Sequence, residues 1–144
     1  MEKFEGKYDT AKGSYYVNCA TDEPEPITEE NKKYYSDAEL KMNVGNRWVD
    51  EIPAVEKNVK SLSRLMMDVG ALLAQQIDQF AKSNIKTYEK DHLTRIISTG
   101  HNHIGRMLNY FPFQDKGDTE DDWCGWHNDH GSLTALTSAM YIDG

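Results

Sequence analysis

The chain has 144 residues, of which 38% are hydrophobic and 10% aromatic, enough for one domain with a core. Its formal net charge of -8 and pI of about 5.0 describe an acidic surface that repels phosphate backbones, so we expect no nucleic-acid partner. No apolar run approaches the roughly 20 residues of a membrane span, and residues 1–5 lack the apolar core of a signal peptide. We therefore expect a cytoplasmic protein without a membrane partner.

The two cysteines, Cys19 and Cys124, lie far apart in the sequence, and neither belongs to a C-x-x-C pair. This spacing predicts free thiols and argues against a thiolate zinc site.

The first regular element in chain order is a short strand over residues 14–18, rich in tyrosine and valine. A surface loop is predicted next, because residues 21–26 are acidic and contain two prolines. A long helix is then predicted over residues 50–82, with Asp50 as its cap and Pro53 in its first turn. Its apolar positions recur every three or four residues, which predicts a helix face that packs in the core: Ile52, Val55, Val59, Leu62, Met66, Val69, Leu73, Ile77 and Phe80.

The second half of the chain is predicted to change from helix to strand. A helix over residues 88–98 ends at Gly100, and a strand from Ile104 to Phe111 ends at Pro112. A polar loop over residues 114–122 is followed by strands over 123–130 and 132–142. Helices first and strands second indicate an α+β fold, in which the long helix supports a sheet or barrel.

The segment around His127 holds the residues that suggest chemistry. Residues two apart on a strand point to the same side, so His127 and Asp129 would direct an imidazole and a carboxylate at one point, while Asn128 and His130 point away. Two histidines and one carboxylate bind iron(II) and leave three coordination positions open. An H-x-D pair is a weak signal alone, and its alternative is a hydrogen-bonded surface pair. The preceding strand adds Tyr110, whose hydroxyl can donate to an anionic ligand.

Residues 126–134, which read W-H-N-D-H-G-S-L-T, resemble the H-x-D-H-G-S-L-T stretch of the isopenicillin-N-synthase-like, 2-oxoglutarate- and iron(II)-dependent oxygenases. Residues 109–112 (N-Y-F-P) are similar to the strand that precedes it there, and the helix over residues 46–80 to the helix before the barrel. Residues 9–16 look like an early segment of an uncharacterised, plant-like subgroup. The resemblance implies a double-stranded β-helix (jelly roll) with helices outside.

The resemblance also implies roles for individual residues. His127 and Asp129 would be iron ligands, Tyr110 and Asn109 would lie near 2-oxoglutarate, and Leu133 would line the substrate pocket. His130 would be structural. Apart from the resemblance, Trp126 and Trp123 are candidates for a substrate wall, although aromatic residues on a barrel strand are more often core. The expected activity is hydroxylation or a related oxidation of a small organic substrate, with dioxygen as co-substrate.

The chain departs from the family pattern at its amino-terminal end, where a strand region ahead of residues 9–16 is not found, and after the H-x-D motif. Family members have a second iron-binding histidine and an R-x-S pair for the distal carboxylate of 2-oxoglutarate, and neither occurs between His130 and Gly144. We therefore expect a single partial, jelly-roll-type oxygenase domain over residues 1–144. Residues 1–100 would be its helical and loop support, and residues 101–144 the first strands of an incomplete barrel.

Two alternatives remain open from the sequence. His101 and His103, together with His127, Asp129 and His130, superficially resemble the clustered ligands of a zinc hydrolase, although Gly105 interrupts the single run that such enzymes use. The other alternative is a non-catalytic jelly-roll binding module.

Overall fold

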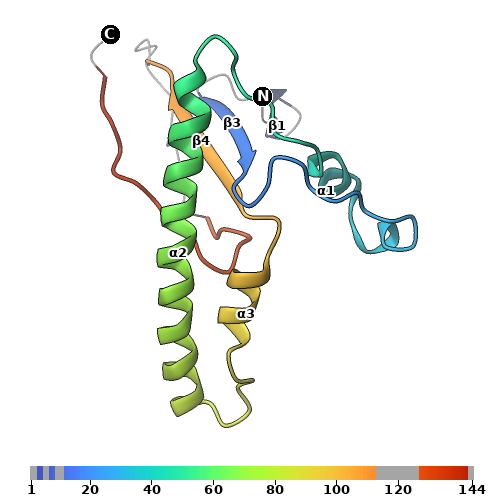
Figure 1. Ribbon diagram of the computed structural model, residues 1–144, viewed down its shortest axis with the longest axis vertical. Helices are drawn as coiled ribbons and strands as arrows, with labels where there is room; N and C mark the ends of the chain where they lie inside the picture. The colour runs from blue at the N-terminus through green and yellow to red at the C-terminus, as the bar shows by residue number, and fades with distance from the viewer. Residues whose placement is uncertain (1–2, 5–6, 9–11, 113–126, 143–144) are drawn as a thin grey trace. The chain divides into compact units, whose positions relative to one another are not determined.

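A computed structural model describes residues 3–4, 7–8, 12–112 and 127–142 of the chain. Helices and strands both occur in it, as expected for an α+β protein (Figure 1). The elements in chain order are β1 (Lys3–Phe4), β2 (Lys7–Tyr8), β3 (Lys12–Asn18), the 3-10 helix η1 (Lys32–Tyr34), α1 (Asp37–Met42), α2 (Pro53–Asn84), α3 (His92–Thr99) and β4 (Ile104–Tyr110).

The chain divides into two compact units. One unit comprises residues 17–105 and contains the helices. The other comprises residues 1–16 and 106–144, and it contains the short antiparallel pair of β1 and β2, in which Lys3 lies opposite Tyr8. The residues suggested for metal and cofactor binding, from Asn109 to Leu133, all belong to this second unit.

Strands β3 and β4 form a two-stranded sheet, and both strands were predicted from their composition. The Cys19 amide donates a 2.7 Å hydrogen bond to the His103 carbonyl, and the side chains of Val17 and Cys19 lie against Gly105. The later residue of β3 thus meets the earlier residue of β4: Cys19 pairs with His103, and Val17 lies against Gly105. The two strands are therefore antiparallel. The predicted order of helices before strands is wrong, because β3 precedes the helices and pairs with β4, which follows them.

Helix α2 spans 32 residues, close to the predicted range, with Pro53 at its first turn as expected. The predicted cap is wrong: Ile52, rather than Asp50, occupies the capping position, and it makes no side-chain cap. At the other end the backbone amide of Ile85 donates to the carbonyl of Ala81, which satisfies one of the final carbonyls. The following helix α3 ends at Gly100, as predicted.

The two helices α2 and α3 lie side by side and pack against each other (Figure 1). The buried positions of α2 are Ser63, Ala74, Asp78 and Ala81, and a side chain added at Gly70 would touch Ile97 of α3. The prediction that the larger apolar stripe of α2 packs in the core is wrong, since Leu62, Val69, Leu73 and Phe80 are all exposed. Small residues permit a close helix approach, whereas the large ones lie on another face.

A polar cluster organises the loop between β3 and α2. The Asn46 side chain accepts a 2.7 Å hydrogen bond from the Asn18 amide and donates to the carboxylate of Asp22 at 3.0 Å. Trp48 donates to the same carboxylate at 3.1 Å, and Lys60 of α2 forms an ion pair with it. The hydrogen bonds from Lys60 and Asn46 lower the pKa of Asp22, partial burial raises it, and the net pKa is below its ordinary value. The cluster fixes the acidic loop to α2.

The segment from His127 to Ile142 contains no helix or strand, and it bends at residues 130–132. The strand predicted over residues 132–142 is therefore wrong. The strand predicted over residues 123–130 is wrong for residues 127–130, whereas residues 123–126 lie outside the described part of the chain. Within the described ranges, no helix is both long and apolar enough to cross a membrane.

Candidate metal centre

The side chains of His127 and Asp129 converge, although the strand that was expected to align them is absent. His127 Nε2 lies 3.3 Å from Asp129 Oδ1. Both side chains are about half exposed, at 59% and 50% respectively, so the pair is accessible from solvent. An imidazole nitrogen and a carboxylate oxygen are thus presented together at the surface of the segment.

Asp129 is held in place by a residue that the sequence analysis did not single out. Thr134 Oγ1 donates a 2.6 Å hydrogen bond to Asp129 Oδ2, so one carboxylate oxygen is engaged and the other faces His127. The hydrogen bond from Thr134 lowers the pKa of Asp129, desolvation raises it, and the charges of His127 and His130 lower it again. The net pKa is below its ordinary value, so Asp129 is a carboxylate at neutral pH.

The bend at residues 130–132 explains how Thr134 reaches Asp129. On a continuous strand two residues five apart point to opposite faces and lie about 16 Å apart. A chain that turns back on itself brings them within hydrogen-bond distance. A turn signal was available in the sequence, because Gly131 and Ser132 are adjacent there, and such pairs favour turns over strands.

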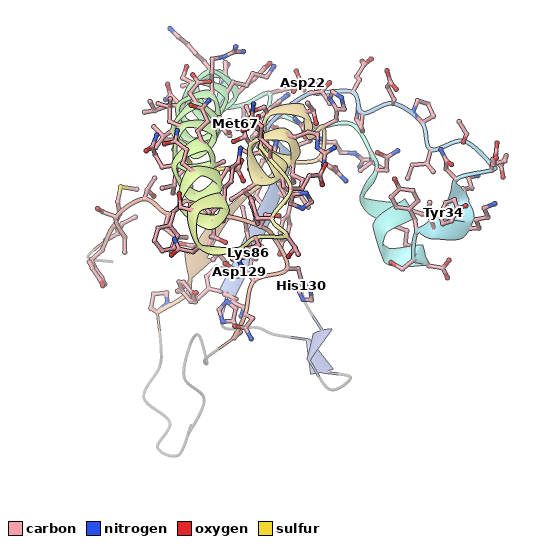
Figure 2. All side chains as sticks on the ribbon, turned by 90° about the horizontal axis from the view of Figure 1, so that it is seen from below. Asp22, Tyr34, Met67, Lys86, Asp129 and His130 are labelled. Carbon is pink, nitrogen blue, oxygen red and sulfur yellow. The ribbon has the colours of Figure 1, made fainter. Side chains whose placement is uncertain are left out.

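The other proposed residues of this segment are placed as follows. Leu133 is half-buried, whereas Asn128 and His130 are exposed. Asp129 and His130 are labelled in Figure 2, on a stretch drawn without helix or strand. Trp126, the suggested pocket wall, lies outside the described residues, as does Trp123.

Tyr110 and Asn109 lie at the end of β4, where 2-oxoglutarate was expected to bind. Tyr110 is half-buried and Asn109 is exposed. Consecutive residues of a strand face opposite sides, so the two side chains cannot both point at one ligand from a regular strand. Of the two, the half-buried Tyr110 is better placed to be held in a fixed position.

Of the residues suggested for a zinc hydrolase, His101 and His103 belong to the compact unit of residues 17–105, whereas His127, Asp129 and His130 belong to the other unit. The Nε2 atom of His103 is 3.0 Å from the carbonyl oxygen of Ile97, so this nitrogen acts as a hydrogen-bond donor and only Nδ1 of His103 could bind a metal. His101 is exposed. In the described ranges, no group of three or more histidine, cysteine, aspartate or glutamate side chains is arranged to hold a metal ion.

A second polar centre, also missed by the sequence analysis, lies between α2 and α3. Asp78 is only 3% exposed, yet its carboxylate accepts hydrogen bonds from Tyr88, from the Leu93 amide and from both the amide and the hydroxyl of Thr94. All the buried side-chain polar atoms in the described part of the chain have such partners. The centre is closed and fully satisfied, which is typical of a structural role.

Comparison of the chain with models of known protein families, with curated proteins and with solved structures gave no match.

Proposed function

We propose that this chain contributes two protein ligands, His127 and Asp129, to the iron(II) site of a 2-oxoglutarate-dependent dioxygenase. The observation that carries the proposal is the 3.3 Å separation of His127 Nε2 and Asp129 Oδ1. The resemblance of residues 126–134 to the oxygenase motif supplies the identity of the metal and of the co-substrate. In that family the motif belongs to a jelly roll, so the proposed fold is a jelly roll as well.

The distance suits two ligands of one ion. Donor atoms at about 2.1 Å from a metal, in neighbouring positions of an octahedron, are roughly 3.0 Å apart. The pair is therefore within a few tenths of an ångström of metal-binding geometry. The pair supplies one imidazole and one carboxylate. These are two of the three protein ligands in an iron site of two histidines and one carboxylate.

His127, Asp129 and the residues around them have different roles in the proposed reaction. Asp129 supplies a negative charge that favours a divalent ion, and Thr134 holds its second oxygen and so fixes the direction of the first. His127 must be neutral at Nε2 to bind. When bound, iron(II) couples the conversion of 2-oxoglutarate and dioxygen into succinate and carbon dioxide to the oxidation of a C–H bond of the substrate. Tyr110 would donate a hydrogen bond to a 2-oxoglutarate oxygen, and Leu133 would offer an apolar contact to a small organic substrate.

Metal binding by the 144-residue chain tests the two ligands directly. Manganese(II), a paramagnetic substitute for iron(II), should broaden the NMR signals of His127, Asp129 and their neighbours. The variants His127→Ala and Asp129→Ala should each weaken binding by about 10-fold or more. The matched control is His130→Ala, which removes an exposed imidazole next to Asp129 and should leave binding unchanged. Equal losses in all three variants, or no binding by the unsubstituted chain, would reject the proposed ligands.

Turnover tests the reaction separately. Two of the family's functional groups, the second histidine and the R-x-S pair, do not occur among the 144 residues, so turnover is expected only of a protein that contains this chain together with them. With iron(II), ascorbate and dioxygen, such a protein should convert 2-oxoglutarate into succinate, and His127→Ala should abolish the conversion. Metal binding that is tight for zinc and accompanied by ester or amide hydrolysis would favour the hydrolase instead. A chain that binds no metal would favour the non-catalytic binding module.

A further inference from the structure

Helix α2 carries a large and mostly apolar face along five turns, and its residues are exposed apart from the half-buried Met66. Its residues follow a heptad spacing: Leu62, Met66, Val69, Leu73, Gln76 and Phe80 alternate between steps of four and three. The exposed fractions are 43% for Leu62, 55% for Val69, 51% for Leu73 and 71% for Phe80. Leu65 and Leu72 flank this row and are equally exposed. We refer to these eight residues as the α2 face.

The α2 face is separate from the surface that packs on α3. With 100° per residue, the buried row of Ser63, Ala74 and Ala81 is centred about 130° around the helix axis from the α2 face. The contact with α3 falls within this side of the helix, where Gly70 lies against Ile97 and Asp78 binds the first turn of α3. The packing with α3 therefore leaves the α2 face uncovered.

No charged residue lies on the α2 face. The nearest charged residues of this part of the helix are Arg64 and Asp68, which are about 100° or more around the axis from its centre. The face can be buried without removing any charge from water, which would otherwise cost several kcal/mol per ion. Uncharged positions are unusual on a solvated helix face, where lysine and glutamate normally alternate.

The exposed area is sufficient for a dimer interface. The six large aliphatic and aromatic side chains with the highest exposure leave on the order of 600 Å² of apolar surface uncovered, if a fully exposed side chain has about 180 Å². Two copies would bury about 1,200 Å², which reaches the lower end of stable specific interfaces. Patches of several hundred square ångströms on a monomer generally mark an interaction site.

The sequence of the face is complementary to itself in one orientation. When a second α2 runs antiparallel, with a two-fold axis at Ala71, Leu62 lies opposite Phe80 of the partner subunit, and Val69 lies opposite Leu73 of the partner subunit. The first and fourth heptad positions then meet layer by layer, as in an antiparallel coiled coil. The large Phe80 meets a leucine, and the smaller Val69 meets another leucine. Met66 and Gln76, the one polar layer, meet each other.

We propose that α2 is a dimerisation helix, which pairs with α2 of a second copy in this antiparallel arrangement. The dimer does not depend on the proposed metal site, since that site belongs to the other compact unit of the chain. Its occupant is a second copy because the face is self-complementary, uncharged and large enough.

Sedimentation equilibrium of the 144-residue chain tests the proposal. The expected mass is twice the 16.5 kDa of the chain. Leu73→Glu places two charges in the central layers and should raise the dissociation constant by about 100-fold or more. The control Gln75→Glu adds the same charge to an exposed position of the same helix turn, away from the face, and should leave the dimer intact. Circular dichroism establishes that both variants keep their helices.

Two results would overturn the proposal. The first is a chain that stays monomeric at 100 micromolar or above. This includes a monomer whose α2 face is covered by other residues of the same chain. The second is a dimer that Leu73→Glu leaves unchanged.

Cysteine cross-linking tests the orientation, in a background with Cys19→Ser and Cys124→Ser. In the antiparallel dimer Leu72 lies beside its own counterpart at the two-fold axis, so Leu72→Cys should form an intersubunit disulfide. Gln79→Cys lies far from its counterpart and should not. In a parallel, in-register dimer the two positions are equivalent and the two variants would behave alike, and that result would reject the antiparallel arrangement.

Discussion

The hydroxyl of Thr94, in the first turn of α3, donates a 2.6 Å hydrogen bond to the carboxylate of Asp78, which lies 16 residues earlier on α2. The amides of Leu93 and Thr94 donate to the same carboxylate at 3.0 and 2.8 Å. These are the amides that a helix-capping side chain normally satisfies. Asp91, the residue in the capping position of α3, has a left-handed backbone and makes no side-chain cap, so Asp78 performs this task from the neighbouring helix.

Removal of the Asp78 carboxylate should therefore destabilise the packing of the two helices. In Asp78→Ala the amides of Leu93 and Thr94 and the hydroxyl of Tyr88 lose their acceptor in a buried place, which is more costly than the loss of a solvated hydrogen bond. We expect the Tm, measured by circular dichroism at 222 nm, to fall by roughly 5 °C or more. Asp68→Asn, at an exposed position of the same helix, is the control and should shift the Tm by much less. Similar shifts in the two variants would contradict the capping role.

The same carboxylate should make stability depend on pH in the acid range. Burial raises the pKa of Asp78, but the hydrogen bonds from Thr94, Tyr88 and Leu93 outweigh it and hold the pKa well below its ordinary value. An unfolded aspartate has a pKa of about 3.9. Because the folded pKa is the lower one, the stabilisation is fully present above the pKa of the unfolded aspartate. It is lost as the pH falls from there towards the lower pKa of the folded state.

Urea denaturation between pH 7 and pH 2.5 measures this effect. The free energy of unfolding should decline below about pH 4 in the unsubstituted chain and decline less steeply in Asp78→Asn. Asp22 and Asp129 also have lowered pKa values and contribute slopes of the same sign in both proteins. The difference between the two curves therefore isolates Asp78, and parallel curves would show that its ionisation is not linked to folding.

The sequence predicted the elements whose signals are local. Strand β3, helix α2 with Pro53 in its first turn, the end of α3 at Gly100 and strand β4 all follow from short-range periodicity and turn residues. Cys19 has a free thiol, as its isolated position in the sequence predicted.

The features that the sequence did not reveal depend on residues far apart or on competing local signals. The cap that Asp78 supplies to α3 joins two helices, and the contact between Val17 and Gly105 joins two strands separated by the helices. Around Asp129 the alternating pattern favoured a strand, whereas the glycine and serine that follow it favour a bend. The bend prevails, and it adds Thr134 to the candidate metal centre in a way that period-two alternation excludes.

Gly105 is required by the close approach of β3 and β4. A β-carbon at this position would lie 2.8 Å from Cys19 Sγ and 3.0 Å from Val17 Cγ2, which is closer than van der Waals contact permits. Gly105→Ala should lower the free energy of unfolding by about 1–3 kcal/mol, as is typical of overpacking. Chemical denaturation provides the measurement.

Two further variants distinguish a steric cause from a general glycine effect. Gly131→Ala is the control, because its nearest contact, the Leu133 carbonyl oxygen, would be 3.6 Å away in ordinary contact. In Gly105→Ala combined with Cys19→Ala the closest contact is relieved, so part of the lost stability should return, and the two effects should not be additive. Additive losses would mean that the two side chains do not clash.

Thr134 provides the sharpest test of how the candidate metal centre is organised, and this prediction rests on the proposed function. Thr134→Val keeps the size of the side chain but removes the hydroxyl that holds Asp129 Oδ2. Without it the carboxylate can rotate away from the metal-binding orientation, so the manganese(II) affinity, measured by electron paramagnetic resonance, should fall by about 10-fold. Thr134→Ser retains the hydroxyl and should retain most of the affinity. If Thr134→Val binds manganese(II) as well as Thr134→Ser does, while His127→Ala loses binding, then Asp129 binds the metal without help from Thr134. If none of these variants affects binding, the metal binds elsewhere.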